Sequence, residues 1–299
     1  MHADSIINSI MSFWRMDAVS ICDLILIIGY LLIGLLCIIA KVKKSRSQAI
    51  FIGTTSFLNY TLAFGVGRTI HLCLCYFYGY RIQVIGVLPI YRYNDHFTVL
   101  VDMACNLLYF FSMMMFVLIC LHSVNTHPSV TVVNEKLDIS VKKMWVIVIS
   151  VILCIAVVAC YLLGFITNNV FIFASAGIFS VLEIILIVKW IQFYKSIRTV
   201  ILNTVIPLNV KRNQICSANQ RCSLYIVSLV GRISLQILLS FNYVLHISSF
   251  ALTLLYLLFT EITPLLAAVI HQLSSIHTSQ IFEGYFTNLL TSLQDVLSV

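Results

Sequence analysis

Apolar residues form seven long runs along the chain, separated by shorter segments in which polar residues gather. The runs cover about residues 18–40, 49–76, 97–121, 144–166, 170–190, 222–245 and 250–270. A helix of about 20 apolar residues spans the hydrocarbon core of a bilayer, and each run reaches that length. The pattern therefore predicts an all-α, polytopic membrane protein built as a seven-transmembrane-helix bundle.

A different pattern follows the last run. Apolar residues recur there at helical spacing, with polar residues on the other faces: Ile281, Phe282, Tyr285, Phe286, Leu289, Leu290, Leu293 and Leu297. This spacing predicts a C-terminal amphipathic helix along the inner membrane surface, with packing on a partner protein as the alternative. The chain thus divides into an N-terminus (1–17), the bundle (18–270) and a tail (271–299).

Composition supports the membrane interpretation. Of the 299 residues, 61% are hydrophobic and only 10% are charged. Seven spans with their connections leave no room for an independent soluble domain. The first run is long and begins late for a secretory signal, so we expect a retained span rather than a cleaved segment.

Lysine and arginine gather in alternate connections between the runs. They lie in the first, third and fifth connections: Lys41, Lys43, Lys44 and Arg46; Lys136, Lys142 and Lys143; Lys195, Arg198, Lys211, Arg212 and Arg221. Short cytoplasmic loops carry the positive excess, which predicts an extracellular N-terminus and a cytoplasmic C-terminus in the plasma membrane. The net charge of +7 follows from this topology. The lipid bilayer, through its anionic lipids, is therefore the expected partner, and nucleic acid is not.

Cysteine placement argues against a disulfide framework. Eight of the ten cysteines lie in or at the ends of apolar runs, where small core residues are expected. Cys216 and Cys222 lie in or beside the fifth connection, and lipidation of either is left open. Their spacing is not that of a metal site, and the sequence predicts neither a metal nor a cofactor.

One set of polar residues interrupts the outer parts of the runs. Arg68 and His71 share a face of the second run, Asp102 and Asn106 share a face of the third, and Asp23 lies in the first. A charge in hydrocarbon is costly unless paired, so Arg68 is expected to meet Asp102, Asp23 or both. The five side chains are predicted to line an outward-facing ligand crevice. Ion pairs that merely fix helix register are the alternative.

A second set lies deeper. Arg232 in the sixth run and Glu261 in the seventh both fall near mid-membrane, and Glu183 lies in the fifth. An Arg232–Glu261 pair, exchangeable towards Glu183, is predicted to act as a switch or a structural tie rather than as a ligand contact. Pro264, three residues after Glu261, is expected to kink the seventh helix by removing one backbone hydrogen bond.

The motifs of common enzyme classes are absent from the sequence. It has no paired zinc-binding histidines with a glutamate, no nucleophile elbow and no phosphate-binding glycine loop, so an enzyme is not expected. A membrane transporter remains an alternative, because intramembrane charges also mark ion paths, although no internal repeat is evident. A structural or partner-trafficking membrane protein is a third possibility.

Seven runs, an outside N-terminus, basic inner connections, a proline in the seventh run and an amphipathic tail together resemble a G-protein-coupled receptor. Within that superfamily the chain is similar to the nematode-type serpentine chemoreceptors, which have a short N-terminus and little tail. The resemblance implies a receptor that binds a small external chemical in the outer half of the bundle. It also implies that the inner loops signal to a heterotrimeric G protein.

The chain departs from rhodopsin-like receptors at three places. The third run ends in "ICLHSVN" without the acidic-Arg-aromatic triplet, and the seventh reads "ITPLLAAVI", from which only Pro264 corresponds. The connection "TNNV" is too short and has no cysteine for the usual bridge to the third helix. These departures argue against a rhodopsin-like activation sequence. The ligand and the G-protein subtype are not predicted.

Overall fold

The computed structural model describes residues 18–45, 54–82, 96–125, 136–203, 207–244 and 254–274. These residues form helices and contain no strand, which confirms the all-α prediction for this part of the chain. The elements are α2 (Ala18–Ser45), α3 (Thr54–Ile82), α4 (His96–Asn125), α5 (Lys136–Leu162), α6 (Asn168–Asn203), α7 (Leu208–Val244) and the π-helix η1 (Tyr256–Ile262). An α-helix continues from η1 to residue 274.

Five of the described helices contain segments long and apolar enough to cross a membrane. The segments are Leu24–Lys43, Val101–His122, Val170–Asn203, Leu208–Leu238 and Tyr256–Ser274. In helix α5, the part whose side chains the structure describes contains the apolar segment Val148–Leu162. Helix α3 falls outside this set because polar side chains such as Arg68 and His71 dilute its hydropathy. Length and hydropathy thus indicate an integral membrane protein and support five of the seven predicted spans.

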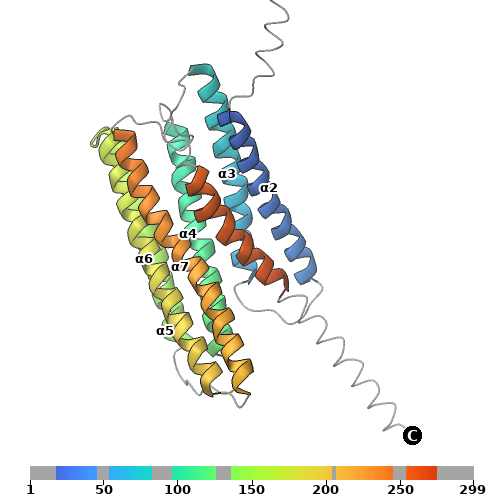
Figure 1. Ribbon diagram of the computed structural model, residues 1–299. Coiled ribbons are helices and arrows are strands. Elements are labelled where there is room, and N and C mark those ends of the chain that lie inside the picture. Colours follow the sequence, from blue (N-terminus) through green and yellow to red (C-terminus); the bar gives the residue numbers. More distant parts are fainter. Residues whose placement is uncertain are drawn as a thin grey trace, which may run out of the picture.

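The helices run side by side as one bundle (Figure 1). Helix α3 packs between α2 and α4, α6 packs on α4, α5 and α7, and η1 contacts α7 and α2. One face of α2 shows how the bundle meets its surroundings, since Tyr30 and Ile33 are fully buried whereas Leu31 and Leu35 are each 54% exposed. Large apolar side chains on the outer face suit a lipid environment.

A glycine ends α5 and reverses the chain. Gly164 adopts φ +76°, a left-handed conformation that costs glycine little. The Phe165 N–H donates to the Cys160 carbonyl (2.9 Å) and the Gly164 N–H donates to the Tyr161 carbonyl (3.0 Å). This pair of bonds is a Schellman motif, which satisfies the last carbonyls of α5 and lets α6 begin four residues later at Asn168.

Helices α6 and α7 extend well past the predicted ends of their apolar runs. Helix α6 continues beyond residue 190 to Asn203, and α7 begins at Leu208 instead of residue 222. The fifth connection is therefore mostly helical, which corrects the sequence-based boundaries. The hydropathy pattern reports where apolar residues stop, whereas backbone hydrogen bonding continues through polar residues that also favour helices.

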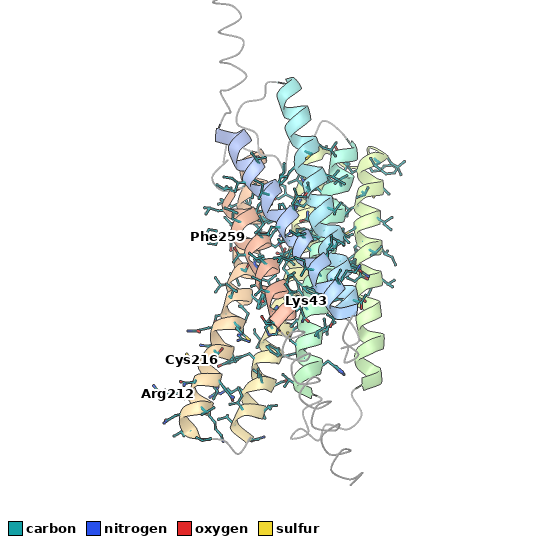
Figure 2. All side chains as sticks on the ribbon, turned by 90° about the vertical axis from the view of Figure 1, so that its right-hand side faces the viewer. Lys43, Arg212, Cys216 and Phe259 are labelled. Atoms are coloured by element: carbon teal, nitrogen blue, oxygen red, sulfur yellow. The ribbon has the colours of Figure 1, made fainter. Side chains whose placement is uncertain are left out.

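Arg212 and Cys216 lie near the free end of this α6–α7 hairpin, beyond the level of Lys43 at the end of α2 (Figure 2). The Lys211 side chain donates to the Leu202 carbonyl at 2.9 Å and so links the start of α7 to the end of α6. The predicted amphipathic helix, with residues 281–297, lies outside the described residues. The N-terminal segment 1–17 also lies outside them.

Candidate functional site

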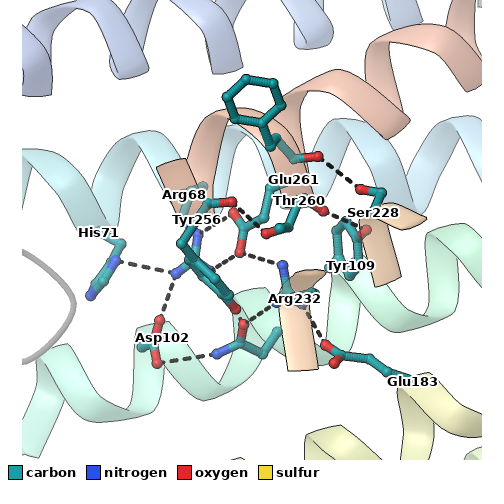
Figure 3. Close-up of polar contacts among 12 residues, drawn as sticks. Arg68, His71, Asp102, Tyr109, Glu183, Ser228, Arg232, Tyr256, Thr260 and Glu261 are labelled. Atoms are coloured by element: carbon teal, nitrogen blue, oxygen red, sulfur yellow. Dashed lines mark hydrogen bonds and ion pairs between the residues drawn. The ribbon is translucent and has the colours of Figure 1, made fainter. Parts of the chain in front are cut away.

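Charged side chains that are buried in the middle of the bundle meet in one network (Figure 3). Arg68 from α3 and Arg232 from α7 are each 1% exposed, and Glu261 from η1 is fully buried. Glu183 from α6 is 3% exposed, and the Asp102 side chain from α4 is 15% exposed. Five elements, far apart in sequence, therefore converge on a single polar centre.

Glu261 is the centre of this network. Its Oε1 accepts hydrogen bonds from Arg68 Nη2 at 2.5 Å and from Arg232 Nη1 at 2.7 Å. Its Oε2 accepts from Arg68 Nε at 3.0 Å and from the Tyr30 hydroxyl at 2.7 Å. The Arg68 contact is bidentate, a geometry in which two parallel N–H donors match the two carboxylate oxygens. One carboxylate thus ties α2, α3 and α7 to η1.

Arg68 also reaches α4. Its Nη1 donates to Asp102 Oδ1 at 2.5 Å and lies 3.4 Å from His71 Nδ1, while its Nη2 donates to Asn106 Oδ1 at 3.2 Å. Asn106 in turn donates to Asp102 Oδ2 at 3.1 Å. The predicted Arg68–Asp102 pair is confirmed, and His71 and Asn106 lie beside it. The side chain of Asp23 lies outside the described part of the chain, so its predicted contact stays a prediction.

Arg232 makes the matching contacts on the other side of Glu261. Its Nε donates to Glu183 Oε1 at 2.5 Å, and its Nη2 donates to Asn106 Oδ1 at 2.7 Å. The guanidinium carbon lies 4.1 Å from the centre of the Tyr109 ring, within cation–π range. The predicted Arg232–Glu261 pair is confirmed. Glu183 and Glu261 hold Arg232 at the same time, and the predicted exchange between them in a change of state stays a prediction.

The outer and the deeper polar set are joined, a connection that the sequence did not predict. Arg68 of the outer set bonds directly to Glu261 of the deeper set, and Asn106 accepts from both arginines. Depth along a helix locates a Cα atom, but a long arginine side chain carries its guanidinium away from that level. Asp102, Arg68, Glu261, Arg232 and Glu183 therefore form one continuous chain of ion pairs.

Helix geometry around Pro264 explains how Glu261 reaches this position. The segment Tyr256–Ile262 is π-helical, and the Thr263 N–H donates to the Leu258 carbonyl five residues back. Pro264 has no N–H to donate and its ring crowds the preceding turn. The expected distortion at Pro264 therefore takes the form of a π-helical turn, a feature that is rare and concentrated at functional sites.

Two backbone carbonyls lose their usual donors in this turn. In a regular α-helix the Phe259 carbonyl would accept from residue 263 and the Thr260 carbonyl from Pro264. Instead, the Ser228 hydroxyl donates to the Phe259 carbonyl at 2.8 Å, and the Tyr109 hydroxyl donates to the Thr260 carbonyl at 2.7 Å. Side chains from α7 and α4 thus satisfy the irregular turn, as a buried backbone requires.

Sequence reasoning missed the roles of Tyr30 and Thr260. Tyr30 lies within an otherwise apolar run. A tyrosine buried there needs a hydrogen-bond partner for its hydroxyl, and this requirement could have identified Tyr30 as part of the network. Thr260 contributes a backbone carbonyl, which no side-chain pattern reveals. Within the described ranges, no group of three or more His, Cys, Asp or Glu side chains is placed to hold a metal ion.

Comparison of the chain with models of known protein families gives no match. Comparisons with curated protein sequences and with solved structures give none either.

Proposed function

We propose that the chain is a seven-transmembrane chemosensory receptor of the plasma membrane. In this proposal a small external chemical binds in the outer half of the bundle, near Asp102, Arg68, His71 and Asn106. Its binding alters helix packing, and the cytoplasmic ends of the helices pass the change to a heterotrimeric G protein. The two additional spans in this proposal are α3 and α5, because α3 (29 residues) and α5 (27 residues) are both long enough to cross a membrane.

The observation that carries the proposal is the position of Glu261. It lies on a π-helical turn and is held at once by arginines from α3 and α7. Asp102, whose side chain is the most exposed of the network's five charged groups, bonds to the same Arg68. A ligand that competes for Asp102 or Arg68 would therefore act on the contact that positions the last described helix. A ligand shifts a conformational equilibrium only if it binds one arrangement of the helices more tightly than the other.

The basic residues support the proposed orientation. Lys43 at the end of α2 and Arg212 near the start of α7 lie towards the same end of the bundle (Figure 2). The positive excess of short loops faces the cytoplasm, so this end is the cytoplasmic one in our proposal. The long α6–α7 hairpin then projects from the inner surface. It offers a helical, positively charged surface for a G protein.

The test is nucleotide exchange on a panel of heterotrimeric G proteins with the purified protein in nanodiscs. Small volatile and water-soluble compounds are screened for exchange that depends on the compound. Asp102→Asn is expected to weaken the response at unchanged surface expression, because it removes the charge that Arg68 contacts. Asp138→Asn near the start of α5 is the matched control, since α5 contributes no residue to the network described above.

Two outcomes would contradict the proposal. One is the absence of exchange with every G protein from protein shown to be folded, which would favour a transporter or a partner-dependent membrane protein. The other is a compound response that Asp102→Asn and Arg68→Gln both leave unchanged. That result would mean that the polar network takes no part in ligand binding.

A further inference from the structure

Three polar side chains beside the Arg232–Glu183 pair keep an oxygen without a hydrogen-bond partner among the described residues. They are Ser180 Oγ, Glu183 Oε2 and Gln236 Oε1. The three residues are 9%, 3% and 7% exposed, respectively. Burying a polar group without a partner costs about 1–3 kcal/mol, and more for a charged group, so each of these oxygens calls for a donor.

The register of α6 against α7 makes the three residues neighbours. Three contacts show that the helices are antiparallel and fix their alignment: Trp190 with Tyr225, Glu183 with Arg232, and Phe173 with Phe241. Between these contacts, position 180 of α6 falls opposite position 234 or 235 of α7, which is next to Gln236. Ser180 lies one turn from Glu183 on α6, and Gln236 lies one turn from Arg232 on α7, so both lie on the same side of the Glu183–Arg232 pair.

Among the residues that the structure describes, the charged groups of the network are unequal in number. Two guanidinium groups face three carboxylates, those of Asp102, Glu183 and Glu261. Both oxygens of Glu261 are bonded, whereas Glu183 uses only Oε1, for Arg232. The unbonded Glu183 Oε2 is therefore where an additional positive charge is best placed. An unpaired negative charge within the membrane is energetically unfavourable, so a positive charge beside Glu183 Oε2 would be stabilising.

The chemistry of the three oxygens selects a type of occupant. A carboxylate oxygen and an amide oxygen only accept hydrogen bonds, and a serine hydroxyl accepts as well as donates. A primary ammonium group carries one positive charge and three N–H donors, one for each oxygen. We propose that Ser180, Glu183 and Gln236 form a subsite between α6 and α7 for the ammonium group of a small primary amine.

This subsite refines the proposed receptor function and rests on it for the origin of the amine. Ser180 and Gln236 lie on the side of Glu183 that faces the α5–α6 connection, which is the outer side in the proposed orientation. An amine that enters from outside would meet these two residues first and then Glu183. Because Glu183 also holds Arg232, the bound ammonium group acts directly on the ion pairs of Glu261.

The test measures thermal unfolding of the purified full chain in nanodiscs without G protein. n-Propylammonium is titrated against three probes at matched ionic strength: tetramethylammonium, which has the charge without N–H donors, n-propanol, which lacks the charge, and sodium. A ligand that binds only the folded state raises the melting temperature with its concentration. The expected result is a saturable rise with n-propylammonium alone.

Variants then locate the effect. Gln236→Leu and Ser180→Ala are each expected to raise the apparent Kd at least about tenfold, as for loss of a hydrogen bond to a charged group. Ser175→Ala is the matched control, because Ser175 lies on the same helix and bonds to the Phe171 carbonyl at 2.7 Å. Gln236→Glu keeps the acceptor oxygen and adds a charge, so it should tighten binding even where Gln236→Leu fails to fold.

Several results would overturn the subsite. These are no saturable rise with n-propylammonium, an equal rise with sodium or tetramethylammonium, and an unchanged Kd in both Ser180→Ala and Gln236→Leu. Weaker binding in Gln236→Glu would do the same. The measurement involves no G protein, so amine binding without nucleotide exchange would support the subsite while contradicting the receptor function.

Discussion

The Tyr109 hydroxyl donates a 2.7 Å hydrogen bond to the Thr260 carbonyl, the acceptor that Pro264 leaves without its usual helical donor. The ring of the same Tyr109 lies against the guanidinium group of Arg232. One side chain of α4 thus supports both the irregular turn of η1 and the cation that binds Glu261. This double contact couples backbone geometry to the ion-pair network.

Tyr109→Phe is expected to destabilise the protein by about 1–3 kcal/mol, because the Thr260 carbonyl would stay buried without a donor. Thermal unfolding in nanodiscs measures the loss. Tyr60→Phe serves as the matched control, since the Tyr60 ring packs on Phe111 and that contact survives the substitution.

A double-mutant cycle tests the cause of this loss. Pro264→Ala restores an N–H group that can donate to Thr260, so Tyr109→Phe should cost less in that background than in the natural chain. Equal costs in both backgrounds would show that the Tyr109 hydroxyl does not replace the donor that Pro264 lacks. The hydrogen-bond explanation of the η1 turn would then be wrong.

Glu261→Gln should be among the most damaging substitutions in the network. It leaves Arg68 and Arg232 buried without their shared carboxylate, and breaking a buried ion pair costs about 3–5 kcal/mol. Under the proposed function it should also change basal nucleotide exchange. Unfolding measurements and exchange assays on the same nanodisc preparation give both values.

The double variant of Glu261→Gln with Arg68→Gln should cost less than the sum of the two single variants, by more than about 0.5 kcal/mol, because the second change removes a stranded charge. Gly177→Ala combined with Glu261→Gln is the control pair. Open space surrounds the Cβ position of residue 177, so the effects of these two substitutions on stability should add. Strict additivity of Glu261→Gln with Arg68→Gln would mean that the two side chains do not interact in the membrane.

Much of the site followed from one rule, that charges inside apolar helices need partners. The rule paired Arg68 with Asp102 and Arg232 with Glu261, and both pairs are present. The rule did not predict the Arg68–Glu261 contact that connects the two pairs. Glu261 reaches Arg68 from a π-helical turn, whose register differs from that of an α-helix. The hydropathy pattern likewise located the helices, but it missed the polar helical extensions of α6 and α7.

Close packing of α2 against α3 places Tyr30 next to Glu261, and a glycine makes this packing possible. A Cβ atom added at Gly65 would lie 3.1 Å from the Tyr30 carbonyl oxygen and 3.7 Å from the Gly34 nitrogen. Both neighbours belong to the α2 backbone, which cannot rotate aside as a side chain can. Gly65→Ala should therefore push α2 away from α3 and loosen the 2.7 Å bond between Tyr30 and Glu261.

The expected result of Gly65→Ala is a destabilisation of about 1–3 kcal/mol, as for an overpacked core, in thermal unfolding of nanodisc samples. The control Gly177→Ala should instead be neutral or stabilising by up to about 1 kcal/mol, because alanine favours a helix more than glycine and no atom lies within 4 Å of the new Cβ. Tyr30→Phe combined with Gly65→Ala should lose less than the two single changes together, since both weaken the same Tyr30–Glu261 bond. A gain of stability in Gly65→Ala would mean that α2 and α3 do not approach this closely in the bilayer.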